Sequence, residues 1–215
     1  MALNLSSHLL PSVKKAAQGN RVDESAVQSN TLEQTFVSRN KHERMEWLRD
    51  AGMGLFIHWS LDSQLGCVIS HTLVGASQDY ADRFYEMLPK TLERGEWDFD
   101  HYASLARLAG FRYAVLTTKH HNGFCLWPSA STGFNVTNTA VGRNLVKEYA
   151  EAFRRQGIAV GFYFSPEDFN FLRSQNMTIT RTPTEPYSPE LTRAYRDYLK
   201  IQMTELMRDF GQVDV

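Results

Sequence analysis

The pattern of apolar and polar positions divides residues 41–215 into alternating helical and extended segments. Four segments combine helix-forming residues, apolar side chains on one face and a final glycine, which predicts amphipathic helices at 41–52, 97–110, 142–157 and 188–211. Between them lie three largely apolar runs, which predict strands buried on both faces at 53–60, 113–119 and 158–165. Residues 213–215 then begin a fourth strand.

Strands that alternate with helices predict an α/β fold with parallel strands. A Rossmann or flavodoxin-like sheet normally carries a glycine-rich phosphate loop after the first strand, and HWSLDSQLG is no such loop. A (β/α)8 TIM-type barrel fits better, because polar and aromatic residues follow each strand. A whole barrel takes ~250 residues, so we expect only its first half in residues 41–215. Residues 1–40 are polar and aperiodic, and we expect a disordered leader there.

Composition narrows the possible partners. With 42% hydrophobic and 12% aromatic residues in 215, the chain can form a sizeable core. A net charge of -1 from 23 basic and 24 acidic residues predicts neither a nucleic-acid nor a membrane partner. The amino terminus lacks a basic segment followed by an apolar core, so we expect no secretory signal and a cytoplasmic location by default. Cys67 and Cys125 are expected to pack as small apolar groups.

Polar and aromatic side chains gather after each predicted strand. Those that follow the three strands in turn are His58 and Trp59, then His120 and His121, then Tyr163, Ser165, Glu167 and Asp168. In a parallel barrel these positions converge on one face. Three histidines that meet in this way indicate a functional site, whereas Glu167 and Asp168 are expected to cap the next segment.

Two chemistries suit such a set. Barrel hydrolases that bind zinc usually carry His-x-His on the first strand, but here His58 is followed by Trp59. Neighbouring residues on an extended backbone point to opposite sides, so we do not expect His120 and His121 to hold one ion, and we predict no metal or cofactor. Imidazoles, a phenol and indoles instead suit a small polyol. Trp59 and Trp127 serve either as a sugar platform or as core packing.

Four stretches carry a resemblance to a known family. RMEWLRDAGMGLFIHWS, YAVLTTKHHNGFCLW, GRNLVKEYAEAFRRQGIAVGFYFS and LMRDFGQVDV resemble the catalytic barrel of the α-L-fucosidases, glycoside hydrolase family 29. The resemblance covers about residues 40–215. It implies a fucosylated glycan or glycoside as substrate and a retaining mechanism through a covalent glycosyl-enzyme. It also implies that the fucose-binding residues are His58, His120, His121 and Tyr163.

The chain departs from the family pattern at two places. Members commonly have Glu-Trp-Tyr where this chain has Gln78-Asp79-Tyr80, so Gln78 is the candidate at a position where the family binds sugar with a carboxylate. The family's nucleophilic Asp follows the fourth strand, a few residues past VDV, and its acid/base lies further on. We therefore assign no catalytic residue, give Asp214 no role, and expect the 215-residue fragment to be inactive on aryl α-L-fucosides.

The sequence also predicts self-association and allows two alternative functions. A half barrel leaves sheet edges unpaired, which predicts self-association. A metal-dependent barrel hydrolase and a non-catalytic fucose-binding module are the alternative functions.

Overall fold

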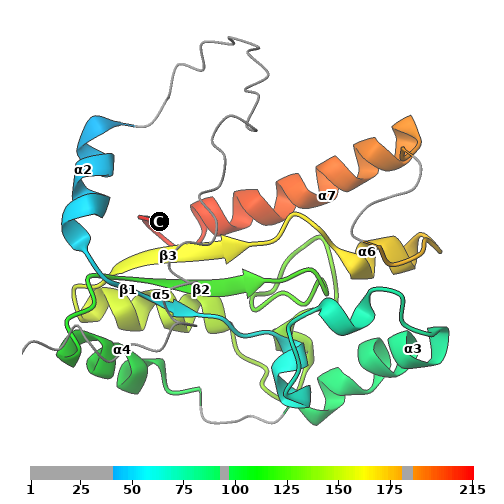
Figure 1. Ribbon diagram of the computed structural model, residues 1–215, viewed down its shortest axis with the longest axis horizontal. Coiled ribbons are helices and arrows are strands. Elements are labelled where there is room, and N and C mark those ends of the chain that lie inside the picture. Colours follow the sequence, from blue (N-terminus) through cyan, green and yellow to red (C-terminus); the bar gives the residue numbers. More distant parts are fainter. Residues whose placement is uncertain (1–40, 93–96, 181–185) are drawn as a thin grey trace, which may run out of the picture. The chain divides into compact units, whose positions relative to one another are not determined.

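A computed structural model describes residues 41–92, 97–180 and 186–215, and a parallel sheet lies at its centre (Figure 1). The strands are β1 (Gly54–Ile57), β2 (Tyr113–Lys119) and β3 (Ala159–Phe164), in the order β1-β2-β3. Both pairs are parallel. This confirms the predicted α/β order, while the predicted leader lies outside the described residues.

The four predicted helices are present, and each ends before its predicted glycine. They are α2 (His42–Ala51), α4 (Phe99–Leu108), α5 (Leu145–Arg155) and α7 (Pro189–Arg208). The Asp98 carboxylate accepts a hydrogen bond from the backbone of His101 at 2.9 Å, which fixes the start of α4. Ser188 caps α7 in the same way.

Short helices that the sequence pattern did not predict occupy the connections after the strands. Those after β1 are Leu61–Leu65, His71–Leu73, α3 (Gln78–Glu86) and Leu88–Thr91. Val136–Asn138 follows β2, and α6 (Phe169–Ser174) follows β3. These ordered connections surround the carboxyl ends of the strands, where α/β sheets build their sites.

Helices α4 and α5 lie on one side of the sheet, and α7 runs beside β3 (Figure 1). Tyr149 of α5 is fully buried, and its hydroxyl donates a 2.6 Å hydrogen bond to the carbonyl oxygen of Ala114 on β2. The ring of Phe210, just after α7, packs edge-on against Phe162 of β3 at 6.1 Å between centroids. Phe162 also contacts Tyr149 at 6.3 Å between centroids, so α5 and the residue after α7 pack against the same side chain of the sheet.

Two predictions about the strands need correction. β1 is not buried on both faces: Phe56 is 47% exposed, and its ring lies on the side of the sheet that carries His58 and Tyr163. Residues 213–215 do not form a strand, although their backbone makes hydrogen bonds with β3. The Asp214 amide donates to the carbonyl of Val160 at 2.7 Å, and the Phe162 amide donates to that of Val215 at 3.1 Å.

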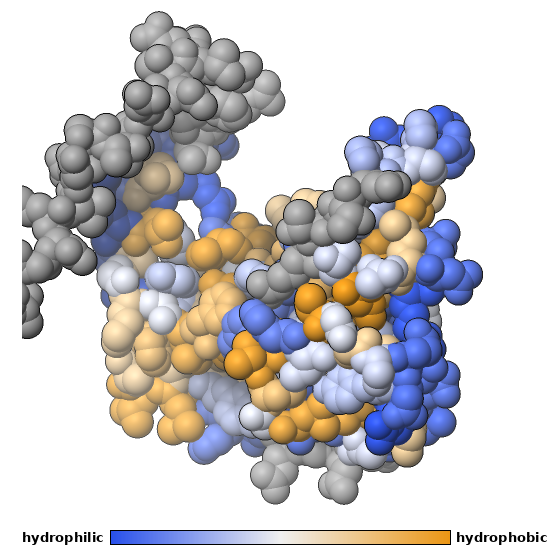
Figure 2. Space-filling view, turned by 45° about the vertical axis from the view of Figure 1, so that its right-hand side comes forward, coloured by the Kyte–Doolittle hydropathy of each residue, from blue (hydrophilic) through white to orange (hydrophobic). Residues whose placement is uncertain are grey.

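Part of the molecule's hydrophobic surface is exposed to solvent. Figure 2 shows broad hydrophobic areas between hydrophilic ones on one face. A groove of about 850 Å³ lies between β1 and α4 and is lined largely by apolar side chains, including Leu55, Ile57 and Phe111. No helix in the described ranges combines the length and apolar character needed to cross a membrane.

Candidate active site

Four of the predicted site residues meet beyond the carboxyl ends of the strands. Ring centroids lie 5.2 Å apart for His58 and His120, 6.1 Å for His58 and Tyr163, and 5.6 Å for His120 and Tyr163. His121 is 4.4 Å from His120. The predicted convergence is therefore confirmed, and we call these four residues the ring cluster.

The two adjacent histidines do not point to opposite sides, contrary to expectation. Their rings are in contact at an interplanar angle of 63°. β2 ends at Lys119, so both histidines belong to a turn that the Gly123 amide closes with a 3.0 Å bond to the His120 carbonyl. Strand alternation does not apply there. No group of three or more His, Cys, Asp or Glu residues in the described ranges is placed to hold a metal ion.

Asn122 ties this turn to the connection after β1. Its side-chain amide donates to Ser60 Oγ at 2.8 Å and to Asp62 Oδ2 at 2.5 Å, and its backbone amide donates to Ser70 Oγ at 3.0 Å. All four residues are buried. Burial raises the pKa of the Asp62 carboxyl, and the hydrogen bond from Asn122 opposes that rise. The network positions His120 by holding both sides of its turn.

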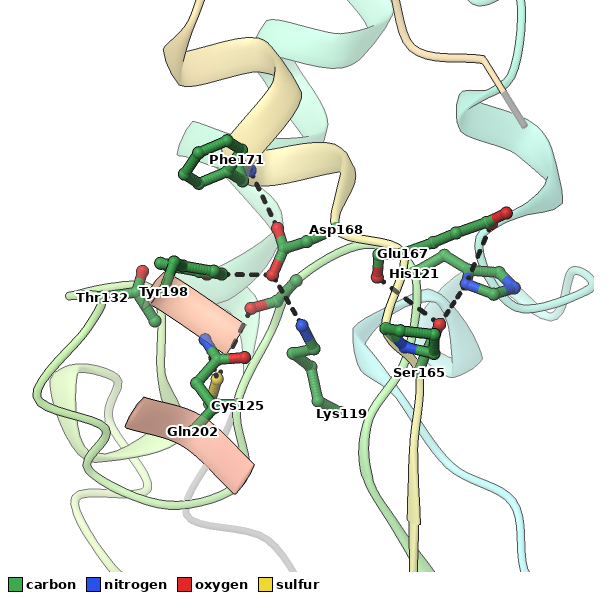
Figure 3. Close-up of polar contacts among 12 residues, drawn as sticks. Lys119, His121, Cys125, Thr132, Ser165, Glu167, Asp168, Phe171, Tyr198 and Gln202 are labelled. Carbon is green, nitrogen blue, oxygen red and sulfur yellow. Dashed lines mark hydrogen bonds and ion pairs between the residues drawn. The ribbon is translucent and has the colours of Figure 1, made fainter. Parts of the chain in front are cut away.

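A buried ion pair between the end of β2 and the connection after β3 supports the same turn (Figure 3). Lys119 Nζ lies 2.8 Å from Asp168 Oδ2, and both side chains have no exposed area. Tyr198 of α7 donates to the same oxygen at 2.9 Å, while the other oxygen accepts from the Phe171 amide at 2.8 Å. Burial and the Asp168 charge raise the pKa of Tyr198. Asp168 therefore caps α6, as predicted, and also neutralises Lys119.

His121 is held by the connection after β3. Its Nδ1 forms a hydrogen bond with Ser165 Oγ and lies 3.2 Å from Glu167 Oε2 (Figure 3). Glu167 was expected to cap the next segment, but its carboxylate faces the imidazole. His120 has a matching contact, since its Nδ1 lies 3.0 Å from Ser70 Oγ. Each histidine of the pair thus has a serine beside Nδ1.

The two tryptophan candidates lie elsewhere. Trp59 packs edge-on against Trp97 at 4.6 Å between centroids and lines the apolar groove beside β1. Trp127 is only 1% exposed, and its Nε1 donates to Glu205 of α7 at 2.8 Å. Core packing is therefore the correct reading for Trp127, since a buried indole has no open face for a sugar.

Gln78 is not brought into the ring cluster. It begins α3, its side-chain amide donates to Asp82 at 2.9 Å, and it borders a separate hollow of about 390 Å³ beside Arg173. The helix that the sequence pattern missed is what places it there.

Asp214 and the two cysteines have structural positions. The Val160 amide donates to Asp214 Oδ2 at 3.0 Å, near the start of β3 and away from Tyr163. Cys125 is buried, Cys67 is half-buried, and both are free thiols, so the packing prediction is confirmed for Cys125. Burial raises the pKa of the Cys125 thiol.

Fold and site together define an α/β protein with an imidazole and phenol cluster at the carboxyl ends of parallel strands. The chain belongs to the α-L-fucosidase family, because the family profile described as Alpha-L-fucosidase matches residues 21–215.

Relatives of known sequence or structure agree with this assignment. The chain is 33% identical over 129 residues to alpha-L-fucosidase 1 of Arabidopsis thaliana, covering 58% of this chain and 21% of that protein. It is 30% identical over 174 residues to the tissue alpha-L-fucosidase of Rattus norvegicus, covering 70% and 37%. The chain thus spans well under half the length of these relatives.

Solved fucosidase structures are similar over the same region. Alpha-L-fucosidase isoenzyme 1 from Paenibacillus thiaminolyticus has a TM-score of 0.64 at 30% identity, covering 80% of this chain and 41% of that one. A Bacteroides thetaiotaomicron family 29 fucosidase, trapped as a covalent intermediate in complex with 2-fluoro-fucosyl fluoride, has a TM-score of 0.64 at 28% identity, covering 81% and 40%.

Proposed function

We propose that this chain supplies part of the fucose pocket of a retaining α-L-fucosidase, and that its sheet is the first part of a (β/α)8 barrel. The ring cluster carries the proposal. Three imidazoles and a phenol, with neighbouring ring centroids 4.4 to 6.1 Å apart, present hydrogen-bonding nitrogen and oxygen atoms beside aromatic faces. Such a set suits a small sugar, which has hydroxyl groups and an apolar C–H face.

The surroundings of the cluster support this role. The Asn122 network and the Lys119–Asp168 pair fix the turn that carries two of the histidines. A site whose side chains are already held loses less conformational freedom when a ligand binds. The covalent intermediate trapped in the Bacteroides relative supports a retaining mechanism through a glycosyl-enzyme for the whole protein.

We expect the 215-residue protein to bind L-fucose, and His58→Ala to weaken binding about tenfold, because one hydrogen-bonding ring is lost. His58 is exposed, so the substitution should leave the thermal midpoint unchanged. Isothermal titration calorimetry measures the dissociation constant. His101→Ala is the matched control, since His101 is also exposed but lies on α4. Equal affinities for the two variants would contradict the proposal.

A further inference from the structure

We propose that Ser70, Ser165 and Glu167 hold His120 and His121 in opposite neutral tautomers. In this arrangement Nε2 of His120 is a hydrogen-bond donor and Nε2 of His121 is an acceptor. Ser70, Ser165 and Glu167 are then positioning residues that act through the two imidazoles. The consequence for sugar recognition rests on the proposed function, whereas the tautomers themselves do not.

The contacts of Glu167 determine the proton on His121 (Figure 3). Oε2 of Glu167 lies 3.2 Å from Nδ1, and a carboxylate oxygen accepts hydrogen bonds. The Ser165 hydroxyl donates to the Glu167 carbonyl oxygen, also an acceptor, at 3.4 Å. Because Ser165 has one proton, its contact with Nδ1 is then one in which Ser165 accepts. All three contacts are satisfied only when Nδ1 of His121 carries the proton.

Ser70 produces the opposite result at His120. The Ser70 oxygen accepts from the Asn122 amide at 3.0 Å, and it lies 3.0 Å from Nδ1 of His120. Within the described ranges, Nδ1 of His120 is the one acceptor in contact with the Ser70 hydroxyl. The hydroxyl therefore donates to Nδ1, and the proton of the neutral ring is on Nε2.

Opposite tautomers suit hydroxyl recognition by adjacent rings. A sugar hydroxyl both donates and accepts a hydrogen bond. Nε2 of His120 can therefore donate to a hydroxyl lone pair, while Nε2 of His121 accepts a hydroxyl proton. Two rings of the same tautomer would offer two donors or two acceptors. Ser70 accepts a hydrogen bond from a backbone amide, whereas Ser165 donates to the Glu167 carbonyl. This difference between the two serines therefore contributes to the specificity of sugar binding.

Long-range proton–nitrogen NMR of ¹⁵N-histidine-labelled protein tests the assignment, because it shows which ring nitrogen bears the proton. Spectra of His120→Asn and His121→Asn identify the two rings. We expect the proton on Nδ1 in His121 and on Nε2 in His120. Ser165→Ala combined with Glu167→Ala should move the His121 proton to Nε2. A wild-type His121 with its proton on Nε2, or with protons on both ring nitrogens, would overturn the proposal.

A fucose titration then tests the link to binding. We expect the double variant to bind L-fucose about three- to tenfold more weakly, in line with the loss of one hydrogen bond. Glu151→Ala, which removes an exposed carboxylate on α5, is the control and should change neither tautomer nor affinity. Undiminished affinity after a tautomer change would refute the role in specificity. Failure of the wild type to bind fucose would contradict the proposed function only, since the tautomers are measured without sugar.

Discussion

Gly123→Ala is expected to destabilise the protein by about 2–5 kcal/mol, from a strained backbone and a steric clash together. Gly123 has φ +85°, in the left-handed region, and a Cβ there would lie 2.8 Å from Cβ of Asn170 and overlap Oδ1 of Asp168. Asp168 cannot easily move aside, because it is paired with Lys119 and caps α6. Urea unfolding of both proteins measures the change in free energy.

Gly110→Ala separates the two causes of that loss. Gly110 has nearly the same dihedral angle, φ +84°, but nothing lies within 4 Å of its hypothetical Cβ. The control should therefore lose only the backbone contribution, about 1–2 kcal/mol. The difference between the two variants is the cost of crowding the Asp168 carboxylate. Equal losses would show that the turn can open away from α6 without penalty.

The sequence alone predicted the three strands, the four longer helices and the meeting of the ring cluster. These predictions depend on local or topological rules: an apolar face and a final glycine mark each predicted helix, and parallel strands bring their carboxyl ends to one edge. His58, His120 and Tyr163 are far apart in the chain, yet strand order was enough to predict their contact. Such predictions need no knowledge of side-chain packing.

The errors came from positions where tertiary packing or a turn determines where a side chain lies. The alternation rule failed at His120 and His121 because β2 ends one residue earlier, at Lys119. Trp127 is buried in the core, and Glu205, far along the chain on α7, accepts a hydrogen bond from its indole nitrogen. No local pattern indicates that partner. Periodicity therefore could not show whether Trp127 packs in the core or serves as a sugar platform.

Positioning residues were harder to predict than the rings they hold. Ser70 lies in a connection without apolar periodicity, and only the fold places it against His120. Asn122 was recognisable as a turn residue from the Asn-Gly pair, but its bonds to Ser60 and Asp62 depend on how the connection after β1 folds back. Glu167 looked like a cap because Asp168, its neighbour, is one.

Lys119→Met is expected to cost about 3–5 kcal/mol, since it leaves the Asp168 carboxylate buried without its cation. Neither side chain of this pair has exposed area, and Nζ also lies 4.5 Å from the ring centroid of Phe164. Arg155→Met is the matched control. It breaks a 2.6 Å pair with Asp100 whose side chains are 55% and 67% exposed, so we expect a loss below about 1 kcal/mol.

A double-mutant cycle shows whether charge or packing produces the loss. Asp168→Asn keeps an oxygen for the amide of Phe171 but leaves the Lys119 ammonium without its counter-ion. If unpaired charge dominates, Lys119→Met should cost much less in the Asp168→Asn background than in the wild type, because no buried charge then remains unpaired. Additive losses, measured by urea unfolding of the four proteins, would instead show that the lysine stem and its contact with Phe164 stabilise the turn, and that neutralisation of Asp168 does not.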